Sequence, residues 1–472
     1  MTTMPPRSST TQRTRTVVAG LGKTGLSVAR HLLAAGCDDL VLADTRLAPP
    51  GLSEIQAGAL GTPLPALPMR FGAFARDTFA DARRVILSPG LAPELPAIAQ
   101  ARAGGAELLG DIELFARAVD APVIAITGTN GKSTVTAMVA RMAEAAGVEL
   151  RVGGNYGRPA LDLLTGGCAG SPTPPAAYLL ELSSFQLETT TSLSPAAAVV
   201  LNLAADHLDR YPTMDAYAAA KARIYPRAGR RIVALDDPYV RAMIPHADTI
   251  GFSGSPPVDE HTFGLVEAQG QTWLAEGRRP LLATRNLRVV GRHNWLNALA
   301  ALAVGRAMGW SMPACLRGLT AFNGLNHRCE WVSERDRIAY YNDSKATNVA
   351  AAQAALAGLG EARRGQHSEA RVVIIAGGVA KEHDFTPLRA SLLAYARGVV
   401  LIGDETERLE RAWTGAAPLT RAQSMDEAVA LATALARPGD AVLLAPACAS
   451  FDWFKDFVAR GHSFRAAVEA LS

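Results

Sequence analysis

Cysteine is rare in this chain, and its distribution excludes one kind of site. The 472 residues include five Cys, and none has a partner at paired spacing: Cys37, Cys168, Cys315, Cys329 and Cys448. Scattered thiols fit a reducing compartment and do not fit a zinc site. We therefore expect a cytoplasmic protein.

An excess of one charge is also missing. The 47 Lys and Arg nearly balance the 44 Asp and Glu, which leaves a net charge of +3. Bulk charge therefore gives no evidence for binding to nucleic acid or to a membrane surface, and we expect no nucleic-acid partner. Hydrophobic residues are 49% of the chain and charged residues 19%, a balance typical of soluble globular proteins.

Long apolar runs, short repeats and low-complexity tracts are absent from the sequence. No apolar run is long enough to span a bilayer, so we expect no transmembrane segment. Residues 1–15 contain Arg7, Arg13 and Arg15 among Ser and Thr without an apolar stretch, which predicts a frayed tail rather than a signal peptide. A chain of 472 residues exceeds one hydrophobic core, so two to four domains are expected.

The most informative segment is Gly-Thr-Asn-Gly-Lys-Ser-Thr at 128–134. It lies between an apolar run, 122–126, that predicts a buried strand and a run, 135–146, that predicts a helix. A Gly-rich turn at this junction directs backbone N–H groups and the positive helix end toward a polyphosphate. Lys132 can then reach the terminal phosphates, and the hydroxyl of Ser133 or Thr134 can hold Mg²⁺. An ordinary Gly-rich turn is the alternative.

A second glycine turn lies near the amino terminus. A predicted strand, 16–19, runs into Gly20-Leu21-Gly22-Lys23-Thr24-Gly25, followed by a predicted helix and a strand that ends on Asp44. This is a βαβ unit with a G-x-G-x-x-G turn and an acid about 20 residues further on. Another apolar run, 84–87, ends at Ser88-Pro89-Gly90, a second turn where α/β sheets bind ligands.

Strand-like and helical stretches alternate along the whole chain, which predicts an α/β protein of three consecutive domains with parallel sheets. The first and last domains are expected to be Rossmann-like, and the middle one a P-loop-type domain that carries ATP. We place the domains at 1–108, 109–324 and 325–472.

Three side chains of the middle domain are candidates for metal or phosphate chemistry. Glu181 ends a predicted strand, where an Mg²⁺ ligand beside a phosphate loop is expected, although an acid there is more often a surface or capping residue. His207 follows another strand between Asp206 and Asp209, which favours a metal or phosphate role. Lys221 lies in an Ala-rich helix, and its surroundings alone predict an exposed lysine.

The third domain contains a polar cluster, Asn342-Asp343-Ser344-Lys345-Ala346-Thr347-Asn348, after an apolar strand. Asp343, Ser344 or Thr347 could each cap the helix that follows. The functional interpretation is an anion or ribose contact, with Lys345 beside transferred phosphate. His327-Arg328, just upstream, offers a second cation.

Taken together, these motifs resemble the Mur ligase family of bacterial cell-wall synthesis, over nearly the whole chain from Gly20 to Ser450. The segment 128–134 is shared with the family's folylpolyglutamate relatives and does not identify a substrate. More specific are 181–188, 206–211, 342–348 and Ala447-Cys448-Ala449-Ser450. This set is similar to that of the D-glutamate-adding branch.

The resemblance implies an ATP-dependent ligase that adds D-glutamate to UDP-N-acetylmuramoyl-L-alanine, and we expect a monomer. It assigns the UDP-linked substrate to Gly22, Thr24, Asp44, Thr45, Arg46, Ser88, Pro89, Gly90, Asn155 and Ser183. It assigns ATP to Gly128, Thr129, Asn130, Gly131, Lys132, Ser133, Thr134, Asn294, Asn297, Arg328 and Asp343. It assigns D-glutamate to Thr347, Lys381, Ser450, Phe451 and Phe457.

The same resemblance implies the catalytic and metal groups. Catalysis would depend on Lys132, His207, Lys221, Lys345 and Arg328. Two Mg²⁺ ions would be held by Ser133, Glu181, His207 and Lys221, with Lys221 carbamylated, which overrules its interpretation as an exposed lysine. The chain departs from the family pattern at Lys23, Cys329, Val379, Ala380 and Ala445.

The mechanism that follows is activation of a carboxylate by ATP as an acyl phosphate, which the amine of D-glutamate then attacks. Three other functions compete with it. A folylpolyglutamate synthase is disfavoured by the UDP-type first domain and by 342–348. A nicotinamide-dependent dehydrogenase is supported only by the turn at 20–25. A non-catalytic nucleotide-binding scaffold does not need Lys132, Glu181, His207 and Lys345.

Overall fold

The computed structural model describes residues 14–60, 67–75, 77–165, 174–207, 210–244, 248–380 and 384–471. The chain divides into two compact units, which are described separately. The first unit comprises the residues up to Lys132, Gly147–Phe252 and Ala303–Trp310, and the second comprises Ser133–Ala146, Ser253–Leu302 and Ser311–Ser472. Within the described ranges, no helix has the length and apolar character needed to cross a bilayer.

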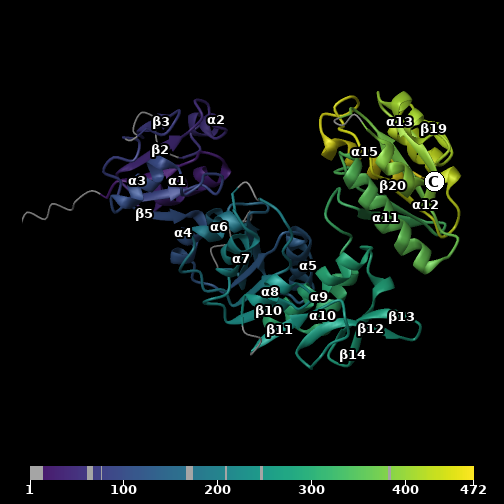
Figure 1. Ribbon diagram of the computed structural model, residues 1–472, viewed down its shortest axis with the longest axis horizontal. Helices are drawn as coiled ribbons and strands as arrows, with labels where there is room; N and C mark the ends of the chain where they lie inside the picture. Colours follow the sequence, from purple (N-terminus) through teal and green to yellow (C-terminus); the bar gives the residue numbers. More distant parts are fainter. Residues whose placement is uncertain are drawn as a thin grey trace, which may run out of the picture. The chain divides into compact units, whose positions relative to one another are not determined.

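The first unit begins with a parallel five-stranded sheet in the order β3-β2-β1-β4-β5 (Figure 1). Its strands are β1 (Thr16–Ala19), β2 (Leu40–Asp44), β3 (Met69–Phe71), β4 (Arg84–Leu87) and β5 (Glu107–Gly110). Its helices are α1 (Lys23–Ala34), α2 (Leu52–Gln56), α3 (Pro96–Ala103) and α4 (Asp111–Ala118). The predicted βαβ unit is therefore confirmed, with β1 beside β2.

A second parallel array, β11-β10-β9-β6-β8-β7, forms the rest of this unit's framework. Its strands are β6 (Val123–Thr127), β7 (Leu150–Gly154), β8 (Ala177–Glu181), β9 (Ala197–Val200), β10 (Arg230–Ala234) and β11 (Thr249–Phe252). In sequence, the helices that follow these strands are α5 (Lys132–Ala145), the 3₁₀ helix η2 (Ala160–Leu163), α6 (Ser184–Glu188), α7 (Met214–Ala222) and α8 (Pro238–Ala242). Of these, α5 belongs to the second unit from Ser133 onward. Strands β6, β8 and β9 are buried throughout, as apolar runs in a parallel sheet should be.

The second unit contains an antiparallel hairpin pair that the sequence analysis did not predict. It consists of β12 (Thr262–Ala268), β13 (Gln271–Glu276) and β14 (Arg279–Ala283). The chain continues through η3 (Thr284–Asn286), α9 (Arg292–Ala307) and α10 (Met312–Thr320).

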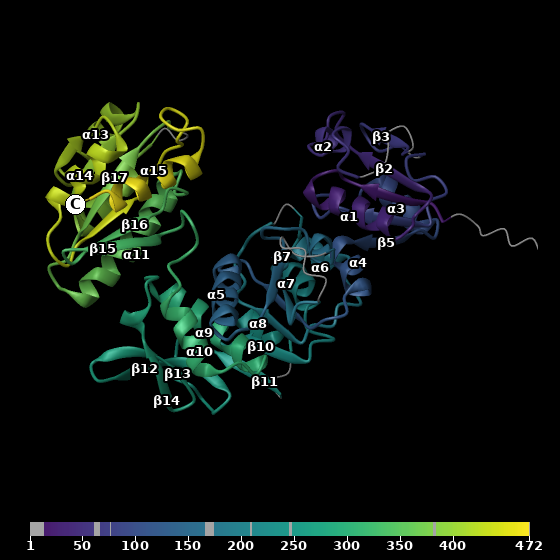
Figure 2. The same cartoon turned by 180° about the vertical axis from the view of Figure 1, so that it is seen from behind.

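The second unit ends in a six-stranded sheet in the order β15-β16-β20-β17-β18-β19, parallel except for the edge strand β15 (Figure 2). The strands are β15 (Glu330–Arg335), β16 (Ile338–Asn342), β17 (Val372–Gly377), β18 (Ala396–Ile402), β19 (Leu419–Arg421) and β20 (Ala441–Leu444). The helices are α11 (Val349–Gln366), η4 (Thr386–Leu388), α12 (Arg389–Tyr395), α13 (Thr406–Trp413), α14 (Met425–Leu435) and α15 (Phe457–Glu469).

Helices cover both faces of this sheet. Successive side chains of a strand point to opposite faces, so each inner strand contributes to two separate cores. Ile374, on β17, packs in one core with α11, α12 and α13, whereas its neighbour Ile375 packs in another with α14 and α15. This is the Rossmann-like arrangement predicted for the third domain. The carboxyl ends of β16, β17 and β20 carry the loops that form its candidate site.

Candidate active site

A pocket of about 540 Å³ opens at the carboxyl ends of β1, β2 and β4. Nine of the ten residues predicted to bind the UDP-linked substrate lie in its wall, and Ser183 does not. The lining comprises Gly20, Gly22, Lys23, Thr24, Asp44, Thr45, Arg46, Ser88, Pro89, Gly90, Leu91, Gly154, Asn155, Gly157, Pro159 and Gln186.

The first glycine turn is packed against the second turn of the pocket. Gly20 has φ +92°, and a Cβ there would lie 2.7 Å from the Cβ of Ser88. The hydroxyl of Ser88 donates to the carbonyl of Gly20 at 2.8 Å. A side chain at position 20 would therefore strain the backbone and separate the two turns.

Asp44 and Arg46, both in the pocket wall, form an ion pair. The buried Asp44 carboxylate accepts hydrogen bonds from Leu21 N at 2.7 Å and from Arg46 Nε and Nη2 at 2.8 and 2.7 Å. Burial alone would raise the pKa of Asp44, but these hydrogen bonds outweigh it and hold the pKa below its usual value. The carboxylate therefore stays ionised and fixes both the glycine turn and the guanidinium.

The opposite wall connects the pocket to the metal candidate Glu181. Asn155 lines the pocket, and its backbone N–H donates to the Glu181 carbonyl at 2.8 Å. Its side-chain Nδ2 donates to Glu181 Oε1, also at 2.8 Å. Glu181 itself is 2% exposed. One side chain thus contacts both the substrate pocket and the buried carboxylate.

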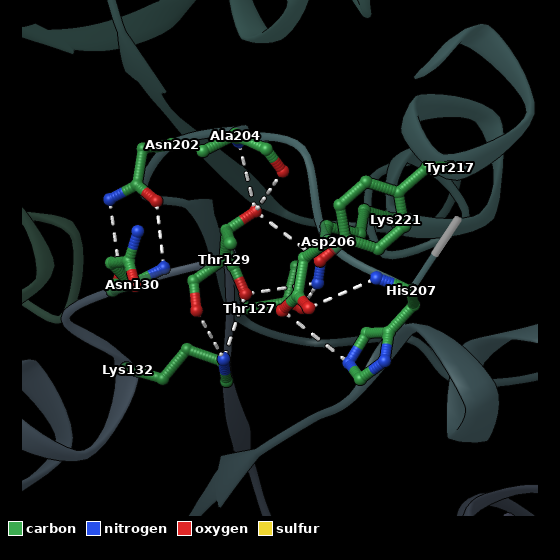
Figure 3. Close-up of polar contacts among 11 residues, drawn as sticks. Thr127, Thr129, Asn130, Lys132, Asn202, Ala204, Asp206, His207, Tyr217 and Lys221 are labelled. Atoms are coloured by element: carbon green, nitrogen blue, oxygen red, sulfur yellow. Dashed lines mark hydrogen bonds and ion pairs between the residues drawn. The ribbon is translucent and has the colours of Figure 1, made fainter. Parts of the chain in front are cut away.

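The predicted phosphate loop, residues 128–131, is hydrogen-bonded to the loop that follows β9 (Figure 3). Gly128 has φ +151°, and a Cβ there would lie 3.0 Å from the Cβ of Leu201. Thr129 N donates to the Asn202 carbonyl at 3.0 Å, and Asn130 N donates to Asn202 Oδ1 at 2.8 Å. Asn202 therefore fixes the loop that connects β6 to α5.

Lys132 and Lys221 converge on one carbonyl of this loop (Figure 3). Each Nζ donates to the oxygen of Gly128 at 2.9 Å. Lys132 also donates to the Thr129 carbonyl at 2.8 Å. The expectation of an exposed Lys221, taken from its helix alone, is wrong, because its side chain reaches inward and is 2% exposed.

This crowding changes the charge that Lys221 favours. Burial and the nearby Lys132 ammonium lower the pKa of Lys221 to about 7, although Asp206 and Glu181 act in the opposite direction. Burial also lowers the pKa of Lys132, again opposed by Glu181 and Asp206. The ring of Tyr217 lies 4.7 Å from Lys221 Nζ and covers it. A large fraction of Lys221 is therefore a neutral amine at neutral pH.

His207 lies beside these lysines in a left-handed backbone conformation, with φ 54°. Its Nε2 is 3.5 Å from Asp206 Oδ2, and its ring is 4.7 Å from that of Phe185. Among the residues that the structure describes, no three His, Cys, Asp or Glu side chains form a group able to hold a metal ion.

Ser183 has a local role at the start of α6. Its Oγ accepts a hydrogen bond from Gln186 N at 3.2 Å, and its own N–H donates to Gln186 Oε1 at 3.1 Å. This reciprocal capping box fixes the Ser183 hydroxyl and the Gln186 amide relative to each other.

The remaining residues predicted to bind ATP lie in the second unit. Ser133 and Thr134 are in the first turn of α5. Asn294 and Asn297 lie one turn apart in α9, where Asn297 Nδ2 donates to Asn294 Oδ1 at 3.2 Å. Asn294 Nδ2 donates in turn to the Val290 carbonyl at 2.8 Å.

The polar cluster after β16 brings cations and a carboxyl group together. Burial raises the pKa of Asp343 to about 6, opposed by Arg328, and burial together with Arg328 lowers the pKa of Lys345. Lys345 Nζ lies 5.2 Å from the ring of Phe457. The helix that follows is capped by Asn348, which accepts from Ala351 N at 2.8 Å, so none of the three expected caps fills that role.

Backbone bonds join the three loops predicted to hold D-glutamate. Val379 and Ala449 exchange hydrogen bonds at 2.9 and 2.8 Å, and Ala447 N donates to the Ala346 carbonyl at 2.9 Å. Thr347 lies in the first of these loops and Ser450, which is buried, in the last. Phe451 is 69% exposed. Lys381 lies outside the described residues.

Arg460, which the sequence analysis did not predict as a site residue, is hydrogen-bonded to these loops. Its buried guanidinium donates to Ser344 Oγ at 3.0 Å and to the carbonyls of Ser344, Cys448 and Ala449 at 2.9, 3.1 and 3.2 Å. An arginine in a helical run gives no sequence signal for such a role. Gln186 lies in the pocket wall but was not predicted as a site residue. Its spacing after Ser183 indicates a capping box, but that pattern gives no sign of a pocket.

Comparisons with known proteins agree with this geometry. Three family models match: "Mur ligase MurD-like, N-terminal domain" at residues 14–110, "Mur ligase middle domain" at 126–305 and "Mur ligase, glutamate ligase domain" at 327–448. UDP-N-acetylmuramoylalanine–D-glutamate ligase of Nitrosococcus oceani is 49% identical over 457 residues, 96% of each chain. The protein of that name from Pseudomonas aeruginosa is 46% identical over 459 residues, 97% of this chain and 98% of its own.

Solved structures show the same fold at low identity. A UDP-N-acetylmuramoyl-L-alanyl-D-glutamate–2,6-diaminopimelate ligase has a TM-score of 0.60 at 19% identity, covering 82% of this chain and 93% of its own. UDP-N-acetylmuramate–alanine ligase of Thermotoga maritima has a TM-score of 0.53 at 18% identity, covering 97% and 99%. The fold is three α/β domains in succession, as predicted, and the chain belongs to the Mur ligase family.

Proposed function

We propose that this protein is an ATP-dependent ligase that joins D-glutamate to UDP-N-acetylmuramoyl-L-alanine through an acyl phosphate, with release of ADP and phosphate. The observation that carries the proposal is the contact made by Asn155, which lines the nucleotide-type pocket and donates to Glu181 Oε1. A substrate anchored at the glycine turns can thus extend its carboxylate toward the phosphate loop. The printed names of the relatives support the substrates.

Within this function, the phosphate loop and Lys132 bind the ATP phosphates. Lys132 Nζ now donates to two carbonyls of its own loop. Bound phosphate oxygens would replace those acceptors, and the ammonium would offset charge as the phosphoryl group moves. Asn294, Asn297, Arg328 and Asp343 are the remaining residues that we assign to ATP.

Mg²⁺ would suit the oxygen donors of this region. Two carboxylates, Glu181 and Asp206, act electrostatically on Lys132 and Lys221. Addition of CO₂ to the neutral amine of Lys221 would form an N–C bond, release a proton and convert a buried amine into an oxygen ligand. We assign Ser133, Glu181, His207 and the Lys221 carbamate as the groups that would hold two Mg²⁺ ions, which would supply positive charge to offset that of the phosphates.

The chemistry then runs in two displacements. The substrate carboxylate attacks the γ-phosphorus of ATP, ADP leaves, and an acyl phosphate forms. The amine of D-glutamate attacks the acyl carbon, the tetrahedral intermediate collapses, and phosphate leaves as the amide forms. Lys345 and Arg328 offset negative charge on the phosphoryl group. Because water would hydrolyse the acyl phosphate, the site must exclude it before the first step.

D-glutamate is assigned to Thr347, Lys381, Ser450, Phe451 and Phe457. Cations and hydroxyl groups suit an amino acid with two carboxylates. We further propose domain boundaries near residues 108 and 324, and a monomeric, cytoplasmic enzyme that binds no nucleic acid. Residue 324 lies in the gap between the second family model, which ends at 305, and the third, which begins at 327, whereas the first model ends at 110, two residues beyond 108.

A competition assay tests this function. The purified protein is incubated with ATP, Mg²⁺ and UDP-N-acetylmuramoyl-L-alanine, together with D-glutamate, L-glutamate or diaminopimelate, and phosphate release and product mass are followed. The expected result is incorporation of D-glutamate alone, since an amine misplaced by about 1 Å loses on the order of 10²-fold in rate. Equal incorporation of another amino acid would overturn the substrate assignment, and no phosphate release would overturn the ligase.

A further inference from the structure

Asp111 is a buried carboxylate that the proposed mechanism does not use. It is the first residue of α4, directly after β5, and is 2% exposed. Its Oδ2 accepts a hydrogen bond from Gln186 Nε2 at 2.9 Å. Its Oδ1 is also buried and has no hydrogen-bond partner within the described part of the chain. A buried acceptor left unsatisfied costs stability, so a purely structural role would be better filled by another residue.

Glu113, two residues further along in the same first turn of α4, is a buried carboxylate whose hydrogen bonds are satisfied. It accepts from Thr191 N, Ser192 N and Ser192 Oγ at 2.7, 2.9 and 2.8 Å, and from Arg117 Nε at 3.0 Å. These bonds outweigh its burial and lower its pKa to about 2. At Asp111, burial outweighs the bonds from Gln186 and the first-turn amides and raises the pKa to about 6.

Asp111 and Ser183 hold the Gln186 amide by its two ends. A carboxylate accepts and does not donate, so the NH₂ end of the amide must face Asp111. The carbonyl end, Oε1, faces Ser183, where it accepts from the backbone N–H at 3.1 Å and lies 3.3 Å from the hydroxyl oxygen. The Ser183 N–H can only donate and so selects the same orientation, and Asp111 adds the contact that holds the NH₂ end in place.

This orientation reaches the substrate pocket, because Gln186 lies in its wall. Its carbonyl is occupied by Ser183, and in the described residues Asp111 is the acceptor for Nε2. The second N–H of Nε2 is therefore the group that can donate to a ligand. A donor at this place suits an oxygen of the bound substrate, such as a phosphate or amide carbonyl oxygen.

We propose that Asp111 is a positioning residue that holds the Gln186 amide with its N–H toward an oxygen of the UDP-linked substrate. The inference rests on the proposed function, since it concerns binding of that substrate. It assigns Asp111 no contact with ATP or D-glutamate.

The test is a double-mutant cycle in the full-length enzyme. Asp111→Ala and Gln186→Met should each raise the KM for UDP-N-acetylmuramoyl-L-alanine about tenfold, the equivalent of one lost hydrogen bond, with kcat and the KM for ATP within about twofold. The double variant should show no further increase, because both changes remove the same contact. Asp111→Asn, which keeps an acceptor for Nε2, should restore a normal KM.

Glu113→Ala is the matched control, since it removes more hydrogen bonds from the same helix without touching the pocket. It should lower Tm and leave every KM unchanged. An unchanged KM for the UDP-linked substrate in Asp111→Ala, or additive effects in the cycle, would overturn the inference. If Asp111→Ala does not fold, an unchanged KM in Gln186→Met would overturn it instead. No turnover by the unmodified enzyme would overturn the proposed function first, and this inference with it.

Discussion

Lys221 and Arg460 are both buried cations, but the two regions that hold them treat the charge in opposite ways. Lys221, beside the phosphate loop, is 2% exposed, and Arg460, beneath the amino-acid loops, is 1% exposed. Across the described residues neither forms an ion pair. Burial lowers the pKa of both, so the difference comes from the lower ordinary pKa of lysine, from hydrogen bonds and from neighbouring charges.

Arg460 is surrounded by oxygen. Five acceptors surround its guanidinium, from the Ser344 carbonyl at 2.9 Å to the Gly377 carbonyl at 3.5 Å. Burial lowers its pKa to about 10, so it remains charged at neutral pH. The planar fork of arginine can satisfy several loops at once, which makes this cation a fixed part of the architecture.

Within the described part of the chain, Lys221 donates to two acceptors, the Gly128 carbonyl at 2.9 Å and Thr127 Oγ1 at 3.4 Å, and the Lys132 ammonium lowers its pKa further. Its pKa of about 7 lets it lose the proton that arginine cannot lose. At these two buried positions, therefore, the arginine keeps its charge at neutral pH, whereas the lysine can give up its proton.

The largest effect is expected from Lys132, the other ammonium on the Gly128 carbonyl. Lys132→Ala should lower the rate of phosphate release by on the order of 10²–10³, because a preorganised electrostatic contact to phosphate is lost. Arg141→Ala, an exposed cation on the same helix, is the control and should retain full activity. A folded Lys132→Ala enzyme with normal turnover would contradict the assignment of this loop.

The second-largest effect is expected from Lys221, whose substitution should lower activity in a way that small carboxylic acids reverse. Lys221→Ala should lose about 10²-fold in kcat and regain activity with formate or acetate, which replace the carbamate oxygens. Lys221→Arg keeps a cation but cannot add CO₂, so it should stay inactive with or without acid. Intact mass under CO₂ should show one added CO₂ in the unmodified enzyme. An unmodified lysine in an active enzyme would refute the carbamate.

Arg460 should affect stability and amino-acid binding more than the chemical step. Arg460→Met leaves several buried oxygens without donors and should lower the free energy of unfolding by about 1–3 kcal/mol. The KM for D-glutamate should rise, because the three loops lose their common contact. Arg460→Lys should have a free energy of unfolding between those of Arg460→Met and the unmodified enzyme. Arg411→Lys, at an exposed position of α13, should change neither the stability nor the KM. Equal stability of Arg460→Met and the unmodified enzyme would show that the fixed cation is dispensable.

The smallest effect is a pH dependence that separates the two cations. Between pH 7 and 10.5 the unfolded chain holds the Lys221 proton more tightly than the folded chain, so the free energy of unfolding should rise with pH in this window. At fixed CO₂ pressure, activity should rise through about pH 7 as the amine becomes neutral. Lys221→Met should lose the stability increase, whereas Arg411→Lys should keep it. A flat stability profile in unmodified protein would contradict the low pKa of Lys221.

Most of the architecture could be predicted from sequence because apolar runs alternate with helical patterns. The segments at 16–19 and 84–87 are strands with the predicted bounds. The hairpins of β12 to β14 were not predicted, since their strands mix exposed and buried residues without a clear period.

The pocket was predictable from its glycine turns, whose spacing is local. The contacts of Lys221 and Arg460 were not, because they depend on partners about 90 and 116 residues away in sequence. The Ala-rich surroundings of Lys221 correctly predicted a helix but indicated an exposed side chain, an interpretation that only the family resemblance overruled. Asp111 and Gln186, 75 residues apart, belong to the same class of unpredictable pair.

The central claim is that a substrate carboxylate is activated by direct transfer of phosphate from ATP. The most direct measurement uses UDP-N-acetylmuramoyl-L-alanine labelled with ¹⁸O in its carboxylate, incubated with the enzyme, ATP, Mg²⁺ and D-glutamate. The account predicts that one labelled oxygen appears in the released inorganic phosphate for each amide formed. Phosphate without label, alongside amide formation, would contradict an acyl phosphate and the mechanism built on it.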